Sequence, residues 1–525
     1  MQSINELPVE VLSRIFILGE KMQRGPRALR LPYVGFQDLV VQVCRHWREV
    51  AISTPELWTY IFISHPPPHL NADLYISRSG CLPLDIDLDM KSSFIQPIHP
   101  FRESEQAERA LETLDFIEKA GGRRDRWGSL IIFSKALFAI ITIYSFFTRT
   151  PTPVLRFVSI KWKSFSDIAQ DQEQIGIEKF GLSKPTLAHG PERPRLSHIE
   201  LNGLPKHFMF DNRLPLVSNL TRFTFVCSET MSLPLHHEFS MVLSASPQLE
   251  HLSVDLRDAL YDIEEIELEP AAIAPIQVRL PFLRSFLLDT SHLYQWSLHL
   301  LQLVDAPGVE YLNLNTEGDS LHPIPVELYE YLAKGRINNV LQCYVPLDDI
   351  SPDSGPIFPR LGHLNIERMS HSVNNISLIF TTFPMVTHVT IGGSGALALH
   401  EYPDYLLNAS HFTYINDNSV DPAVVVGFSN SRAAYKPIST FVWCTAQPEY
   451  LRMQLGLEDN ENWDSGSDRH YHSPPKLRVD HLIIRQIDQT HAYLESDDEA
   501  FVSLDDEDDD LGFDVDEFVV TNWDD

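Results

Sequence analysis

Residue clusters that could perform chemistry are few in this sequence, and their spacing does not favour catalysis. His470-Tyr471-His472 stands close to Asp468, and imidazole and carboxylate groups are metal ligands. The surrounding stretch is polar and holds no cysteine, which is more typical of a solvated loop than of a metal site. Gly392-Gly393-Ser394-Gly395 lacks the spacing of a dinucleotide loop or a nucleophile elbow, and we expect a turn that closes a repeat. We therefore predict a chain that is not an enzyme, with no catalytic residue, metal ion or cofactor.

The cysteine pattern indicates a reducing compartment. The chain has five cysteines, an odd number, and they are far apart and lie mostly in apolar runs: Cys44, Cys81, Cys227, Cys343 and Cys444. This is typical of free buried thiols rather than of a disulfide framework or a zinc site. The sequence starts MQSINELP, without a charged segment followed by an apolar core, so we expect a cytoplasmic or nuclear protein.

The overall charge excludes two classes of partner. The formal net charge is −31 and the pI is near 5.0. Such a field repels nucleic acid and anionic membranes, so we predict neither as a partner. The segment Leu130–Phe147 is apolar enough to suggest a membrane span, but Lys135 interrupts it. We predict a strand followed by a helix there, both buried.

The stretch from residue 5 to residue 58 predicts a small helical module. Pro8 suits the first turn of a helix, where its missing N–H costs nothing. The apolar residues after it cover more than one side of the helix, so this helix needs partners on two sides. A second helix is predicted from Val40 to Ala51, because apolar residues recur there at helical spacing, and Thr54-Pro55 ends it.

This stretch resembles the F-box motif. The matching positions are Leu7-Pro8, Glu10-Val11-Leu12, Ile15-Phe16, Val43-Cys44-Arg45, Trp47-Arg48, Pro55 and Leu57-Trp58. The chain is most similar to the expanded F-box families of mushroom-forming (agaricomycete) fungi. The resemblance implies a three-helix module that binds the Skp adaptor of cullin-RING ubiquitin ligases. The adaptor-binding residues that it implies are Leu7, Pro8, Ile15, Phe16, Val43, Cys44, Trp47, Leu57 and Trp58, although some of them must close the core of the module.

Two alternatives stay open for this stretch. A basic insert, Lys21–Gln37, separates the two halves of the motif. It either lengthens the connection between helices or alters the adaptor-binding face. The stretch could also be an ordinary helical subdomain that packs on its own chain.

A repeat follows, with apolar residues at i, i+3 and i+5 of a short strand. Its copies begin at Trp127, Leu155, Leu196, Leu220, Leu249, Leu283, Val309, Leu361, Val386 and Val479, and a degenerate copy stands at Ile337/Val340. Proline stands two residues before the first apolar position at Pro153, Pro194, Pro247, Pro281, Pro307, Pro359 and Pro384. Proline there ends the preceding helix and directs the chain into the strand.

The repeat resembles irregular leucine-rich repeats, in which each strand pairs with the next. We predict an α/β chain: a small all-α F-box module, an irregular leucine-rich-repeat-like solenoid and a disordered acidic tail. A different α/β array, or a sheet with appended helices, is the alternative. The predicted boundaries are 1–62 for the F-box, 63–82 for a linker and short helix, 83–486 for the solenoid and 487–525 for the tail. From Glu495 to Asp525 the tail has fifteen Asp or Glu residues and no Lys or Arg.

The strand face of a solenoid is the natural binding surface. The candidate residues on it are Arg156, Lys161, His198, Glu200, Arg222, His251, Arg284, Asp289, Asn313, Asn315 and His363. By resemblance, the chain is a substrate-recognition subunit of a Skp-cullin-F-box ubiquitin ligase: the F-box binds the adaptor, and the array binds an unknown protein substrate. A non-catalytic F-box scaffold that acts outside a ligase is the alternative.

Overall fold

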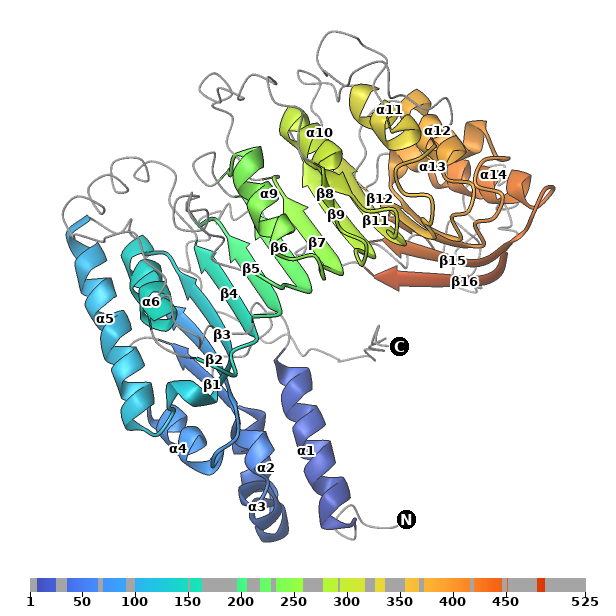
Figure 1. Ribbon diagram of the computed structural model, residues 1–525. Coiled ribbons are helices and arrows are strands. Elements are labelled where there is room, and N and C mark those ends of the chain that lie inside the picture. The colour runs from blue at the N-terminus through green and yellow to red at the C-terminus, as the bar shows by residue number, and fades with distance from the viewer. Residues whose placement is uncertain are drawn as a thin grey trace, which may run out of the picture.

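A small helical module leads into one long parallel sheet that extends through most of the chain (Figure 1). The computed structural model describes residues 7–24, 35–64, 69–90, 100–149, 152–162, 196–204, 218–227, 233–257, 277–290, 293–316, 326–335, 355–367, 373–415, 420–445, 451 and 479–486. The predicted acidic tail, the Asp468–His472 stretch, the degenerate repeat at Ile337/Val340, Cys343 and residues 25–34 of the basic insert lie outside the described residues.

The N-terminal module contains α1 (Val9–Gln23), α2 (Phe36–Val43) and α3 (Arg45–Ile52), followed by the 3-10 turn η3 (Pro55–Trp58). Pro8 directly precedes α1, and Glu10 lies in its first turn, near the positive end of the helix dipole. The prediction of one helix from Val40 to Ala51 was wrong. Cys44 has extended backbone (φ −158°, ψ 173°) and separates α2 from α3. Its Sγ accepts a 3.4 Å hydrogen bond from the Trp47 N–H, so the side chain caps α3.

In the described part of the chain, fourteen strands form the main sheet, and all neighbouring pairs are parallel. The sheet follows chain order, as stacked repeats require. In that order the strands are β1 (Tyr60–Ser64), β2 (Leu84–Met90), β3 (Trp127–Ser134), β4 (Phe157–Trp162), β5 (His198–Asn202), β6 (Arg222–Val226), β7 (His251–Asp255), β9 (Ser285–Thr290), β11 (Tyr311–Thr316), β12 (His363–Ile366), β13 (His388–Ile391), β14 (His411–Ile415), β15 (Ile438–Thr445) and β16 (Val479–Gln486). Two short strands, β8 (Val278–Arg279) and β10 (Val304–Asp305), pair separately.

Burial alternates along the strands, and the apolar positions of the repeat form rows across the sheet. Leu252 of β7 is fully buried and pairs in register with Phe286 of β9, which pairs with Leu312 of β11. Three strands outside the predicted repeat copies have the same spacing and are buried at these positions: Trp58/Ile61/Ile63 at β1, Ala409/Phe412/Tyr414 at β14 and Ile438/Phe441/Trp443 at β15. The sheet therefore begins at Tyr60, before residue 83.

The repeated prolines that the structure describes occupy the second position of a four-residue turn before a strand. In the turn Ser246-Pro247-Gln248-Leu249, the Leu249 N–H donates a 3.1 Å hydrogen bond to the Ser246 carbonyl. The same bond closes the turns at Pro153, Pro281, Pro307, Pro359 and Pro384. Proline suits that position because its φ is already fixed near the value that the turn requires.

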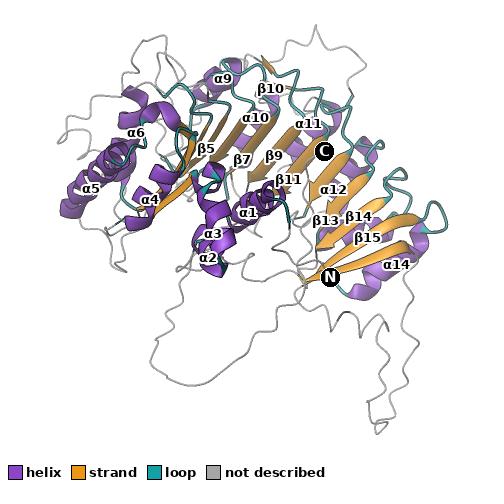
Figure 2. Cartoon of the chain, turned by 90° about the horizontal axis from the view of Figure 1, so that it is seen from below, coloured by secondary structure: helices purple, strands orange, loops and turns teal. Residues whose placement is uncertain are grey.

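The remaining described helices are α4 (Leu70–Arg78), α5 (Pro100–Lys119), η4 (Arg124–Arg126), α6 (Leu137–Arg149), α9 (His236–Ser244), α10 (Tyr294–Leu303), α11 (Val326–Lys334), α12 (Val373–Thr382), α13 (Gly393–Glu401) and α14 (Pro422–Arg432). From α5 onward they lie on one side of the sheet, and the strands face the opposite side (Figures 1 and 2). This arrangement is consistent with an α/β repeat solenoid. We refer to the sheet side without these helices as the strand face.

Three local predictions have clear outcomes. The segment Leu130–Phe147 forms the end of β3 and most of α6, as predicted, and none of the described helices is long and apolar enough to cross a membrane. The glycines after β13 do not form a separate turn, because α13 begins directly at Gly393. A side chain at Gly392 would collide with the Glu367 carbonyl. The described cysteines are free, and Cys81 is exposed rather than buried.

Candidate partner-binding surfaces

Helix α1 has one face inside the chain and one face outside it. Leu12, Phe16 and Glu20 are buried at a four-residue spacing, which places them on one side of the helix. A second stripe at i, i+4, i+7 and i+11 is exposed, namely Val11 (44%), Ile15 (39%), Leu18 (48%) and Met22 (73%). Helix α1 is therefore apolar on two sides: one side packs inside the chain, and the other is exposed.

Helix α2 adds to the exposed apolar surface. Val40 is buried, whereas Leu39 and Val43, four residues apart, are 48% and 58% exposed. Among the described residues, seventeen large apolar side chains are exposed, and eight of them lie between Val9 and Ile52. About half of these exposed apolar residues therefore lie in a small fraction of the chain. Concentrated exposed apolar side chains of this kind are typical of interaction sites.

The structure places the nine predicted adaptor-binding residues in two groups. Phe16, Leu57 and Trp58 are fully buried and close the core of the chain. Trp47 is half-buried, and its ring lies 5.1 Å from that of Phe16. Pro8, Ile15 and Val43 are exposed, and Leu7 and Cys44 are half-exposed. Sequence reasoning did not single out Val11, Leu18, Met22 and Leu39 for this surface, although the helical spacing in α1 would have found the first three.

Close packing of α1 on α2 depends on a glycine. A Cβ atom at Gly19 would lie 2.7 Å from the Phe36 Cε2 atom, so the ring of Phe36 occupies the space that a side chain would need. The two helices can therefore approach closely at this point. The Thr54 hydroxyl connects the end of α3 to α1. Its Oγ1 atom lies 2.8 Å from the Val50 carbonyl in α3 and 2.9 Å from Ser13 Oγ in α1.

Trp58 connects the module to the sheet. Its Nε1–H donates a 2.8 Å hydrogen bond to the Ala51 carbonyl in α3. The guanidinium of Arg78 lies 4.4 Å from the centroid of its ring, and the ring of Tyr75 lies at 5.2 Å, so α4 packs on the same indole. The Tyr75 hydroxyl also donates a 2.8 Å hydrogen bond to Asp38 in α2. Burial, followed by the Asp38 carboxylate, raises the pKa of Tyr75, so the hydroxyl stays a donor.

A second connection lies at the end of α1. Arg24 donates 2.6 Å hydrogen bonds to Glu20 in the same helix and to Asp85 in β2, and its guanidinium lies 4.7 Å from the centroid of the Tyr60 ring. Ser129 of β3 donates a 2.8 Å hydrogen bond to the same Asp85. Burial raises the pKa of Glu20 although Arg24 opposes the shift. The described part of the basic insert thus holds α1 against the first strands.

The predicted strand-face residues lie at or next to the strand positions that alternate with the core. His198, Glu200, Asp289, Asn313 and His363 are half-exposed, Arg222 is exposed and Asn315 is buried. At the carboxyl ends of β7, β9 and β11, Arg257 forms ion pairs with Asp255 at 2.7 Å and with Asp289 at 3.3 Å. Asn315 donates a 3.2 Å hydrogen bond to Asp289. One guanidinium thus faces two carboxylates, so the cluster keeps a net negative charge. Among the described residues, no group of three or more His, Cys, Asp or Glu is placed to hold a metal ion.

Comparisons with known proteins agree with the geometry of the N-terminal module. A family model described as F-box-like matches residues 4–64, so the chain carries an F-box-like domain at its N-terminus. No curated protein matches the chain. Among solved structures, a structural-genomics target protein from Bacteroides fragilis matches with 13% identity and a TM-score of 0.29. The match covers 55% of this chain and 65% of that one.

Proposed function

We propose that this chain is the substrate-recognition subunit of a Skp-cullin-F-box ubiquitin ligase. In this proposal the F-box-like module binds a Skp-type adaptor, the array binds a target protein, and other subunits transfer ubiquitin. The observation that carries the proposal is the exposed apolar stripe of α1 and α2 on a module whose own core is closed. The F-box-like family match supports the identity of the partner.

The proposed adaptor contact consists of Leu7, Pro8, Ile15 and Val43 from the sequence prediction, together with Val11, Leu18, Met22 and Leu39. Covering the open part of one such side chain contributes about 1 kcal/mol of binding free energy. Arg14 of α1 and Arg48 of α3 are exposed and suit the polar rim of such an interface. Phe16, Leu57 and Trp58 contribute to binding only by keeping the helices in place.

The remaining chain then supplies the target-binding part. We propose that the sheet from β1 onward, which includes the predicted solenoid 83–486, is an irregular leucine-rich-repeat-like solenoid whose strand face holds the target, next to a docking module that ends at η3. The ligase function requires a protein that works in the cytoplasm or the nucleus. The contribution to catalysis is proximity, because a bound target presents its lysines at high effective concentration to the loaded conjugating enzyme.

The test is adaptor binding by purified full-length chain. Ile15→Glu with Val43→Glu places two carboxylates in the proposed contact, and Leu7→Ala with Pro8→Ala removes its start; each pair should weaken binding by at least about 100-fold. Leu111→Glu, on α5, is the matched control because Leu111 is exposed to the same extent as Leu18. Undiminished adaptor binding by both double variants would refute the contact.

Adaptor binding alone does not distinguish a ligase receptor from a scaffold. Affinity purification with and without proteasome inhibition should recover cullin together with the adaptor, and a protein enriched only under inhibition is the expected target. Recovery of the adaptor without cullin, and no ubiquitin transfer in a reconstituted ligase, would favour the scaffold.

A further inference from the structure

Histidines align in one row across the strand face. Strand register places His198, Arg222 and His251 on neighbouring strands, followed by Ser285 and Tyr311. The row continues through His363, His388, His411, Thr440 and His481. In six of these strands the residue directly before the second apolar position of the repeat is therefore a histidine, and all six lie at one level of the sheet.

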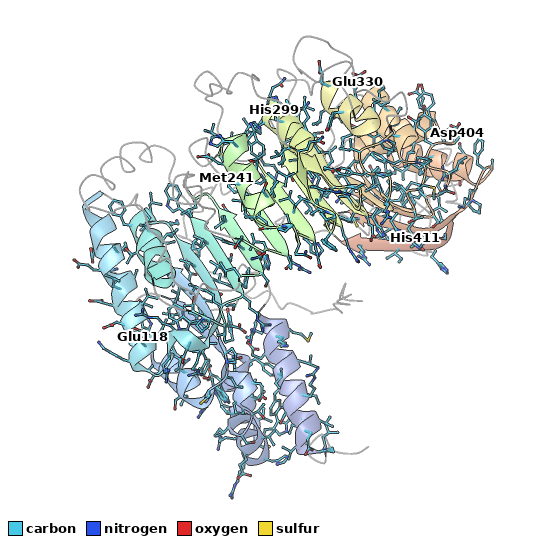
Figure 3. All side chains as sticks on the ribbon, viewed as in Figure 1. Glu118, Met241, His299, Glu330, Asp404 and His411 are labelled. Carbon is cyan, nitrogen blue, oxygen red and sulfur yellow. The ribbon has the colours of Figure 1, made fainter. Side chains whose placement is uncertain are left out.

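Three of these histidines form a stack on adjacent strands. The ring centroids of His363 and His388 are 4.2 Å apart with an interplanar angle of 8°, and those of His388 and His411 are 4.3 Å apart at 15°. The Nδ1 atoms of His388 and His411 each lie 2.9 Å from the hydroxyl of the preceding residue, Thr387 or Ser410. We call His363, His388 and His411 the imidazole stack. Figure 3 shows His411 away from the helices that carry His299 and Glu330.

The contact with Thr387 is consistent with a proton on the Nδ1 atom of His388. When Thr387 Oγ1 donates its hydrogen to the Gly362 carbonyl, 3.2 Å away, it accepts from the Nδ1–H of His388. The nitrogen that gains a proton on acidification is then Nε2. Protonation of neighbouring stacked rings places like charges a little over 4 Å apart, which is unfavourable unless an anion lies beside them.

Two described carboxylates lie near this part of the sheet: Glu310, which precedes β11 and acts on His363, and Glu367, which follows β12 and acts on Cys444 in β15. Burial lowers the pKa of His363; Glu310 opposes this shift and His411 adds to it. Burial and then His363 and His411 lower the pKa of His388 to about 4. The next row outward along these strands is neutral, with Asn365, Thr390 and Thr413 in register. His481 and Arg485 of β16 are the further basic groups on this part of the sheet, and Arg360 stands in the turn before β12.

The same chain contains an anionic segment of suitable length. Between Glu495 and Asp525 it has fifteen Asp or Glu residues and no Lys or Arg, with six consecutive acidic residues at 505–510. This segment follows β16, and β16 is two strands from β14, which carries His411. Strand spacing and rise place the end of β16 roughly 20 Å from His411. The residues between 486 and 505 can span roughly 60 Å when extended, so the acidic run can reach the stack.

We propose that the acidic C-terminal segment, residues 495–525, binds in cis across the imidazole stack and covers this part of the strand face. Carboxylates of the segment accept hydrogen bonds from the protonated rings. Their negative charge offsets the repulsion between neighbouring protonated rings. By linkage, the segment binds more tightly as pH falls, and binding raises the affinity of the stack for protons. The proposal concerns the isolated chain and stands independently of adaptor binding.

The experiment measures binding of a fluorescein-labelled synthetic peptide of residues 495–525 to full-length protein by fluorescence anisotropy. The acceptor is a full-length chain whose own acidic run is neutralised by D505N, D506N, E507Q, D508N, D509N and D510N. The peptide should bind this chain about tenfold more tightly at pH 5.5 than at pH 7.5. The unmodified chain should bind it at least about tenfold more weakly, because its own segment competes at millimolar effective concentration.

Variants of the stack show where the peptide binds. In the neutralised chain, H363N with H388N and H411N should abolish the pH dependence, and H388N alone should reduce it. H198N is the matched control, since His198 occupies the same row but lies 3.5 Å from the Glu200 carboxylate. Equal peptide affinity of the triple variant and the control, or an affinity that does not change with pH, overturns the site. Equal affinity of the unmodified and neutralised chains overturns binding in cis.

Discussion

The indole nitrogen of Trp58 donates a 2.8 Å hydrogen bond to the backbone carbonyl of Ala51, and this bond joins the last helix of the N-terminal module to the turn before the first strand. Trp58 is fully buried, and the guanidinium of Arg78 covers its ring. Trp58 therefore packs against both the N-terminal module and the start of the array, so the two parts are joined by a packed contact.

Substitution of Trp58 should destabilise both parts together. Trp58→Ala removes a buried aromatic side chain, one buried hydrogen bond and one cation–π contact, so we expect a loss of about 4 kcal/mol in the free energy of unfolding. Urea denaturation of the full chain measures it. Phe62→Ala, on the exposed side of β1, is the control and should change stability by less than about 1 kcal/mol. A Trp58→Ala chain as stable as the parent would show that the junction is not a packing centre.

Ile15 and Phe16 should separate binding from stability, because these neighbours in α1 face opposite environments. Phe16 is fully buried against Trp47, so Phe16→Ala should lower the free energy of unfolding by about 3 kcal/mol. Ile15 is 39% exposed, so Ile15→Glu should leave stability within about 1 kcal/mol and weaken adaptor binding. Thermal unfolding combined with adaptor titration distinguishes the two. The reverse pattern would mean that α1 presents its other face.

Glu20 should make the N-terminal module less stable as pH rises. Burial raises the pKa of this carboxyl group above its usual value, so the folded state holds a proton more firmly than the unfolded state. The stabilising contribution is complete below the unfolded-state pKa and is lost as pH rises through the folded-state pKa. Glu20→Gln mimics the protonated form, so its stability relative to the parent should increase between pH 4.5 and pH 7. Urea midpoints across this range check the trend, and a relative stability that falls with pH would contradict it.

His388 should titrate at a lower pH than an exposed histidine. Burial, His363 and His411 lower its pKa to about 4, and NMR detection of its Cε1 proton reports the value directly. H363N with H411N should raise that pKa, because two nearby positive charges are removed. A histidine with a lowered folded-state pKa loses stabilisation as pH falls from the unfolded-state value of about 6.5 towards 4. H388N should accordingly lose less stability than the parent over that pH range. A difference in stability between H388N and the parent that stays constant with pH would rule out a link between the titration of His388 and folding.

Arg432 should be essential for the loop that precedes β14. Its side chain is fully buried, and its guanidinium donates to the carbonyl oxygens of Pro403, Tyr405, Leu406 and Ala409. Arg432→Met leaves several buried carbonyls without a donor, so we expect a loss of about 3 kcal/mol. Arg432→Lys keeps the charge but cannot reach all four oxygens, so it should recover only a small part. Hydrogen exchange of the Ala409 amide is the local measurement, and full recovery by lysine would show that charge alone matters.

Sequence patterns located most strands because the repeat spacing records directly which side chains face the core. β14 was missed because a small residue, Ala409, stands at its first apolar position, and β15 was missed because its proline stands one residue before Ile438 instead of two. The break at Cys44 was not predictable from periodicity, since the helical stripe continues across it. In the module, composition could not separate Phe16 from Ile15, because both are apolar and only helix packing decides which is enclosed.

The imidazole stack shows the same limit. His363 was a candidate from its place in the repeat, and the identical rule would have added His388, His411 and His481. The three rings stack because their strands pair in parallel without a register shift. That register cannot be deduced from the sequence alone. The location of the row could be predicted from the sequence, whereas its electrostatic coupling could not.

The in-register order of the strands also sets a length scale for the whole molecule. From β1 to β14 the sheet advances one strand at a time, which corresponds to roughly 50 Å along its curve at the usual interstrand spacing. Because Trp58 fixes the first strand to the helices, a cargo bound at any given strand would sit at a set distance from the docking end. Gain or loss of a single repeat would move that cargo in steps of about 5 Å.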